Sequence, residues 1–90
     1  GIYQAQHNYQ DALECMKKTL EIRKVLLPIN HPDIGASYSN QGVIYRRLNQ
    51  LDSALKFYTM AVEIYRKSMP AHHPHIAATL MNIGLIYEDK

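Results

Sequence analysis

A repeat with a period of 42 residues runs through the chain and constrains its fold more than any other feature. When the sequence is compared with itself at this offset, 15 of the 48 comparable positions are identical, whereas about 3 would match by chance. Such long periods arise when one supersecondary unit is stacked on copies of itself. The identical residues of the first copy are Ile2, Tyr3, Ala12, Leu13, Glu21, Ile22, Pro28, His31, Pro32, Ile34, Ala36, Asn40, Gly42, Ile44 and Tyr45.

The repeating unit has the pattern of a helical hairpin. Apolar residues recur at three- and four-residue steps, as on one face of an α-helix. Prolines bracket the loops between periods, and polar segments at 8–11 and 49–52 separate the helices within a period. The sequence therefore predicts an all-α fold of five helices, with Pro32 and Pro74 in the first turns of two of them. The predicted helices span residues 1–7, 10–27, 32–48, 52–68 and 74–89.

The signature residues Gly42, Tyr45, Ala54, Tyr58 and Ala61 give the repeat a family resemblance. Their spacing resembles the tetratricopeptide repeat (TPR), which has a small residue and an aromatic on its first helix, then alanine, aromatic and alanine on its second. The longer period, with the segments 20–24, 31–34 and 39–42, resembles the kinesin light chain type of repeat. That resemblance implies a right-handed α-solenoid and binding of short peptides from partner proteins, as the family does with cargo adaptors.

The register divides the single predicted domain, residues 1–90, into three parts. We expect a truncated repeat at 1–31, a complete repeat at 32–73 and the first helix of a third repeat at 74–90.

The first helix of each stacked hairpin should line an extended concave surface suited to a peptide. Asn40 and Asn82 occupy equivalent positions, and an asparagine amide can donate to and accept from a peptide backbone. Alternatively, both asparagines cap or bridge neighbouring repeats, or face water. We therefore predict a non-catalytic interaction scaffold. Its predicted peptide-binding residues are Ser39, Asn40, Val43, Arg46, Arg47, Met81, Asn82 and Leu85.

The charges of this predicted groove change sign between repeats. Arg46 and Arg47 could pair with acidic groups of a ligand, but the equivalent residues are Glu88 and Asp89. A uniformly basic groove is therefore excluded. The apolar residues of the groove either receive an apolar anchor of the peptide or are covered by a neighbouring helix.

A second predicted function is self-association. The register places Leu80, Ile83 and Ile86 where a following helix would cover them, and stacked repeats need neighbours or polar caps. We expect either an excised fragment of a longer array or copies that stack end to end or exchange helices. The sequence thus allows a homo-oligomer or helix-swapped dimer.

No catalytic, cofactor or metal motif is present in the sequence. The four glycines are isolated and form no phosphate-binding loop. His72, His73 and His75 have no cysteine pair or carboxylate set beside them, so no metal is predicted. The net charge of +2, with charges interspersed, disfavours nucleic acid, and no apolar run reaches the ~20 residues of a membrane span. The lone Cys15 is expected to be a buried thiol in a reducing, cytoplasmic setting.

Overall fold

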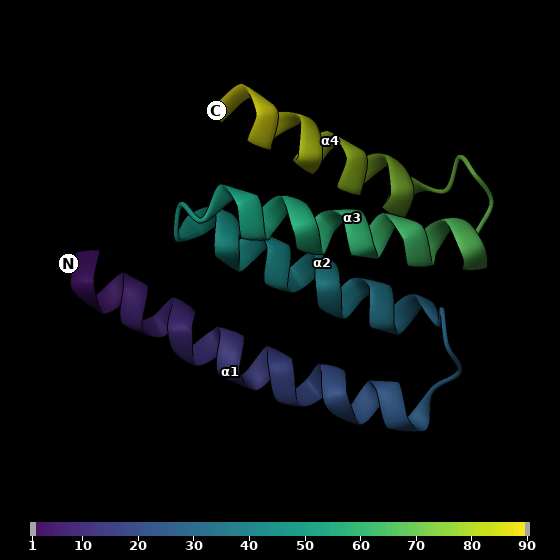
Figure 1. Cartoon of the computed structure of the whole chain (residues 1–90), viewed down its shortest axis with the longest axis horizontal. Helices are drawn as coiled ribbons and strands as arrows, with labels where there is room; N and C mark the ends of the chain where they lie inside the picture. Colours follow the sequence, from purple (N-terminus) through teal and green to yellow (C-terminus); the bar gives the residue numbers. More distant parts are fainter. Residues whose placement is uncertain (1, 90) are drawn as a thin grey trace.

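Four α-helices follow one another along the chain. The computed structural model describes residues 2–89, with side chains described from residue 7 to residue 89. Each helix packs against the next, and consecutive helices run antiparallel (Figure 1). The all-α fold is confirmed, and the last three predicted helices agree with the structure to within one residue. The helices are α1 (Ile2–Leu26), α2 (Pro32–Arg47), α3 (Leu51–Ser68) and α4 (Pro74–Asp89).

The first two predicted helices are one continuous helix, so the described residues contain four helices rather than five. The turn predicted at 8–11 is helical and lies within α1. In the second repeat the equivalent turn contains Asn49 with φ of 61°, a left-handed conformation that a short polar side chain tolerates. His7 stands at that place in the first repeat, and residues 8–11 include neither glycine nor proline. Nothing in the local sequence therefore stops the helix.

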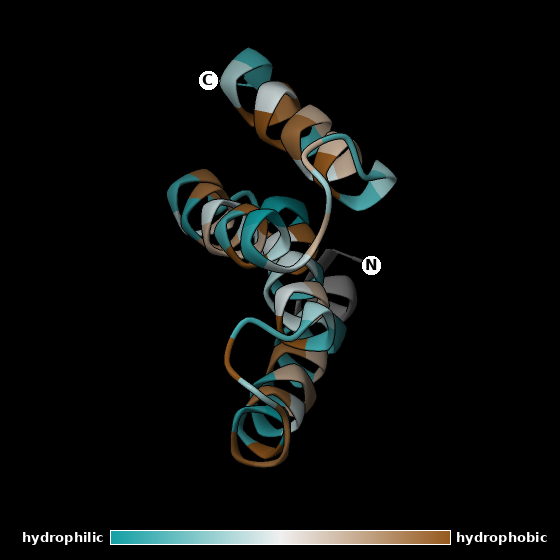
Figure 2. Ribbon diagram, turned by 90° about the vertical axis from the view of Figure 1, so that its right-hand side faces the viewer, coloured by the Kyte–Doolittle hydropathy of each residue, from teal (hydrophilic) through white to brown (hydrophobic). Residues whose placement is uncertain are grey.

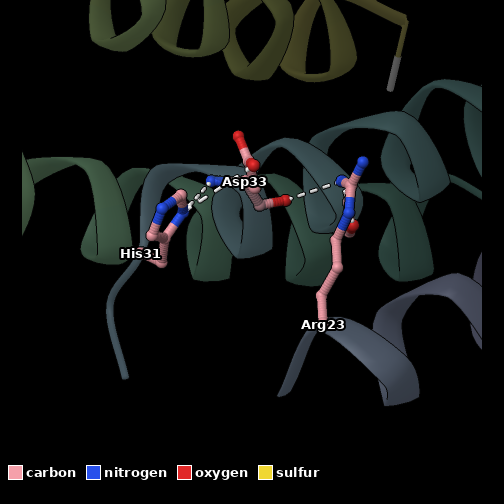
Figure 3. Close-up of polar contacts among 4 residues, drawn as sticks. Arg23, His31 and Asp33 are labelled. Carbon is pink, nitrogen blue, oxygen red and sulfur yellow. Dashed lines mark hydrogen bonds and ion pairs between the residues drawn. The ribbon is translucent and has the colours of Figure 1, made fainter. Parts of the chain in front are cut away.

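A histidine caps each helix that follows an inter-repeat loop. The Nδ1 atom of His31 accepts a hydrogen bond from the backbone N–H of Asp33 at 3.0 Å (Figure 3). The Nδ1 atom of His73 accepts the equivalent bond from His75 at 3.1 Å. A proline follows each histidine at the helix start, where its missing N–H leaves no hydrogen bond unmade. The imidazole thus satisfies an N-terminal donor, as serine or aspartate commonly does.

The closest helix contact is between α2 and α3, where glycines meet aromatic rings. A Cβ atom added to Gly42 would lie 2.9 Å from the Tyr58 ring, and one added to Gly35 would lie 2.8 Å from the Tyr65 ring. Only glycine permits this approach without a shift of the ring. Tyr58 is buried with Ala54 in a core cluster that α4 completes. The glycines of α2 thus allow the aromatic rings of α3 to lie directly against the α2 backbone.

Stacked aromatic rings hold the same two helices together beside the glycines. The rings of Tyr45 and Phe57 lie almost parallel, with centroids 5.1 Å apart, and Tyr38 stacks on Phe57 at 5.9 Å. Each such pair contributes about 0.5–1.5 kcal/mol beyond its buried area. Because α2 uses this face to hold α3, its remaining surface is available to form a groove with α1 and α4.

Candidate functional site

Three adjoining hollows form a groove that crosses α1, α2 and α4. The largest, of about 410 Å³, is lined by Val43, Arg46, Arg47, Tyr58, Asn82 and Asp89. The middle hollow, of about 210 Å³, is lined by Ala36, Ser39, Asn40, Tyr65, His75, Ala78, Thr79 and Asn82. The α1–α2 hollow, also of about 210 Å³, is lined by Cys15, Met16, Thr19, Arg23, Ser37 and Asn40. Because neighbouring hollows share a residue, the three make one continuous surface.

The two equivalent asparagines lie at the joins of this groove. Asn82 borders the largest and middle hollows, and Asn40 borders the middle and α1–α2 hollows. Neither side-chain amide forms a hydrogen bond within residues 7–89. Their donors and acceptors are therefore open to a ligand on that part of the chain. Their role in peptide binding stays a prediction, although both asparagines line the groove.

Arg46 is held inside the groove by a carboxylate of the chain itself. Its Nε and Nη2 atoms donate to Oδ2 of Asp89 at 3.2 and 3.0 Å. This ion pair links α2 to α4 and occupies two of the guanidinium donors that were predicted to meet a ligand acid. The sign reversal between the repeats thus has a structural consequence, because the acid of one repeat neutralises the base of the other.

The other predicted peptide-binding residues divide into two groups. Ser39, Val43 and Arg47 line the groove with the asparagines. Met81 and Leu85 line none of the three hollows, although they are 71% and 39% exposed. The groove therefore gathers the predicted residues of α2 and Asn82 of α4, but it does not gather the two apolar residues of α4.

The three residues predicted for self-association have different surroundings. Ile86 is fully buried against Ala54 and Tyr58, and Ile83 packs against the same cluster. The expectation that Ile86 is uncovered is therefore wrong, because α4 turns this residue toward α3. Leu80 remains 43% exposed.

Several residues that line the groove were not predicted from the sequence. Tyr65 forms part of the floor of the middle hollow, and its ring lies 5.7 Å from that of His75. In the first repeat Arg23 occupies the equivalent position, where it donates to the backbone carbonyl of Asp33 at 2.9 Å and to Ser37 Oγ at 2.8 Å (Figure 3). The 42-residue register relates Arg23 to Tyr65. Both could have been predicted as groove residues if the second helix of each hairpin, and not only the first, had been expected to line the groove.

Burial changes the acidity of the two tyrosines beneath the groove. The pKa of Tyr58 is raised by burial, against the opposing attraction of Arg46 and Arg47. The pKa of Tyr65 is raised by burial and, further, by the negative charge of Asp33. Both hydroxyls are therefore neutral at physiological pH and can serve as hydrogen-bond donors without adding charge to the groove.

The single cysteine lies exposed on α1, where it lines the α1–α2 hollow. The prediction that Cys15 is a buried thiol is therefore wrong. Among the residues that the structure describes, no three His, Cys, Asp or Glu side chains come together in a way that could hold a metal ion. None of the described helices is both long and apolar enough to cross a membrane.

Comparison with known proteins agrees with this architecture. The family model of the tetratricopeptide repeat matches residues 1–67, so the chain belongs to the tetratricopeptide repeat family. No match was found among curated proteins.

The solved structures with a similar fold include two forms of one protein. One contains the nearly identical TPR-like repeats of a Podosopora anserina protein whose description assigns it provisionally to the kinesin light chains. It has a TM-score of 0.76 and 26% identity, with 96% of this chain and 41% of that chain covered. A substituted form of the same protein has a TM-score of 0.75 and 25% identity, with 94% and 40% covered. This chain thus spans about two fifths of the length of both.

Proposed function

We propose that the chain is a non-catalytic scaffold that binds an extended peptide segment of a partner protein along the α1–α2–α4 groove. The observation that carries the proposal is the position of Asn40 and Asn82 at the joins of the three hollows, with no internal hydrogen bond in the described part of the chain. Interaction scaffolding is the general role of TPR proteins, and the groove supplies a specific form of it.

The asparagines would hold the backbone of the peptide. An amide side chain carries both donor and acceptor groups, which are the complement of a peptide unit, and an extended strand presents those units at regular intervals. The spacing of the two asparagines by one repeat suits a ligand that lies across the helices rather than along one of them. Such binding depends on the backbone of the peptide, and its side chains would then enter the hollows.

Charge would contribute less than shape to the choice of ligand. Asp89 neutralises Arg46, and the middle hollow is lined by alanine, serine, threonine and asparagine side chains beside Tyr65 and His75. A peptide of modest charge with small or apolar side chains at alternate positions fits this lining. Alternate side chains of an extended peptide point the same way, so they would enter successive hollows.

The proposal can be tested with a displayed library of random short peptides. Peptides selected on the chain are synthesised, and their affinities are measured by calorimetry for the wild type and for Asn40→Ala and Asn82→Ala. Loss of about two backbone hydrogen bonds should weaken binding about tenfold in each variant. Asn8→Ala is the matched control, because Asn8 is exposed on α1 and borders none of the hollows.

Unchanged helicity with lower affinity in the two groove variants supports the proposal. It fails if no peptide is selected, or if the selected peptides bind both groove variants as tightly as they bind the control.

A further inference from the structure

A fourth hollow, of about 320 Å³, lies on the opposite side of α2 from the groove. Successive residues of an α-helix are rotated by about 100°. Ile34 and Tyr38, which line this hollow, are each two positions from the groove residue Ala36 and therefore point to the other side of the helix. Residues of α1 and α3 complete the hollow, and α2 packs between these two helices (Figure 1). The hollow is thus bordered by helices that are all in place within the described chain.

Apolar side chains make up most of the lining of this hollow. Ile34 and Tyr38 are only 5% and 8% exposed and form its floor, and the half-buried Ile64 of α3 stands at its side. Ile29, in the α1–α2 loop, is 88% exposed at its rim, and Figure 2 shows this loop with a hydrophobic segment between polar ones. An apolar lining with a few polar groups is typical of binding sites in proteins. The polar lining residues are Lys24 and Asn30.

A hydrogen-bonded turn fixes the position of Ile29. The backbone N–H of His31 donates to the carbonyl of Pro28 at 3.1 Å, and Asn30 has a φ of 68°. A positive φ at the third residue is the property of a type II turn, in which asparagine is tolerated and the second residue points outward. Because the turn holds Ile29 in place, little further ordering is needed when this side chain contacts a ligand.

The repeat itself does not require a large apolar residue at this position. The equivalent residue of the second loop is Ala71, which is also exposed, and the same backbone bond runs there from His73 to Pro70 at 3.0 Å. Both loops therefore form the turn and expose its second residue, but only the first presents an isoleucine. Since an exposed isoleucine beside an apolar hollow enlarges the apolar surface, this part of the molecule has the character of an interaction site.

The charge at the border of the hollow is positive and has no partner in the described chain. The last turn of α1 carries Arg23 and Lys24. Arg23 donates to the carbonyl of Asp33 and to Ser37, whereas Lys24 forms no hydrogen bond or ion pair within residues 7–89. None of the described residues that line the hollow is acidic. A complementary ligand thus combines an apolar group with a negative charge close to it.

We propose that this hollow is a second docking site, for a partner-protein segment that inserts one aliphatic or aromatic side chain and pairs a neighbouring carboxylate with Lys24. The volume of the hollow is at the small end of the ~300–1,000 Å³ range of ligand sites, which suits a single anchoring side chain. Because the site and the groove lie on opposite sides of α2, one molecule can hold a segment on each face at the same time. The chain would then bridge two partners, and the second site acts independently of the groove.

The ligand class is tested by selecting displayed random peptides on the chain that carries both Asn40→Ala and Asn82→Ala, so that the groove contributes little. Selected peptides are synthesised, and calorimetry measures their affinities. They should share an aliphatic or aromatic residue with an aspartate or glutamate one or two positions away. They should also bind the wild type as tightly as the doubly substituted chain. The proposal is overturned if no peptide is selected or if the selected peptides share no acidic residue, whatever the groove itself binds.

Two variants locate the binding, each with a matched control in the second repeat. Ile29→Ser removes the apolar rim and should weaken binding about tenfold, whereas Ala71→Ser should leave it unchanged. Lys24→Ala should weaken binding about two- to fivefold, the usual effect of losing an exposed ion pair. Its control is Arg66→Ala, which removes the same charge at the equivalent position of α3 and borders none of the four hollows. Circular dichroism checks that each variant remains helical.

A double-mutant cycle tests the ion pair with Lys24 directly. Replacing the acidic residue of a selected peptide by its amide should weaken binding to the wild type by the same two- to fivefold, but should not weaken binding to Lys24→Ala. An amide substitution that weakens binding to both proteins equally shows that Lys24 is not the partner of the acid and overturns the proposal. Affinity that is unchanged by Ile29→Ser overturns it as well, because the peptide then binds elsewhere.

Discussion

At the scale of single residues, the glycines of α2 and α4 show how the same substitution can have opposite effects on stability at equivalent positions of two repeats. A Cβ atom added to Gly42 would lie 2.9 Å from two atoms of the Tyr58 ring, and that ring is fully buried. The equivalent Gly84 has open space around it. The same glycine is therefore required by packing in one repeat and is only a weak helix former in the other.

We predict that Gly42→Ala lowers the free energy of unfolding by about 1–2 kcal/mol, because crowding against Tyr58 outweighs the gain in helix propensity. Gly84→Ala should raise it by about 0.5–1 kcal/mol, since only the propensity changes. Urea denaturation at a concentration where the chain is monomeric measures both. If both variants gain equal stability, the Tyr58 ring moves freely and the helix contact is looser than its geometry indicates.

At the scale of the helices, the two repeats start their first helices in the same way. A histidine Nδ1 accepts the N–H two residues later in both inter-repeat loops. The proline starts were predictable from the sequence, since Pro32 and Pro74 recur at the 42-residue offset. The capping role of the histidines was not, because it depends on the rotation of the imidazole ring over the first turn.

We predict that His31→Ala lowers the free energy of unfolding by about 1 kcal/mol, the usual effect of losing an N-cap. His31→Asn should retain most of the stability, because asparagine is among the best N-cap residues. Thermal and urea unfolding compare the two variants with the wild type. Equal losses in both variants would show that His31 acts through packing in the loop and not through the hydrogen bond to Asp33.

The helices also mark where sequence reasoning succeeded and failed. Periodicity and prolines placed α2, α3 and α4 to within a residue, because each is bounded by a proline or by Asn49 in a left-handed turn. The break predicted at 8–11 rested on polarity alone, and polar residues without glycine or proline continue a helix readily. Residues that stop a helix, such as proline or an asparagine in a left-handed turn, are thus a better guide to helix ends than polar residues are.

At the scale of the whole molecule, the repeat register located the groove but not its depth or its internal contacts. It predicted Asn40 and Asn82 as ligand contacts; both line the groove, and their contact with a ligand stays a prediction. It missed Tyr65 and Arg23, because these reach the groove from the second helix of each pair. It also could not show that Asp89 meets Arg46 of the other repeat, since that contact depends on the angle between α2 and α4. Contacts between repeats require the geometry of stacking, which the sequence of one repeat does not contain.

Stability should be distributed unevenly along this stack. In repeat proteins each unit is stabilised by its neighbours. Among the described residues, α2 and α3 each pack extensively against two other helices, whereas α1 packs in this way only on α2 and α4 only on α3. The core clusters centre on α3, with Ala54, Tyr58, Ala61 and Tyr65 among their buried members. The α2–α3 hairpin is therefore the stable centre of the molecule.

We predict that backbone amide hydrogens of α2 and α3 exchange most slowly in native-state hydrogen exchange, and that those of α1 and α4 exchange faster through local opening. Uniform protection of all four helices in the dilute chain would contradict this distribution and indicate one cooperative unit.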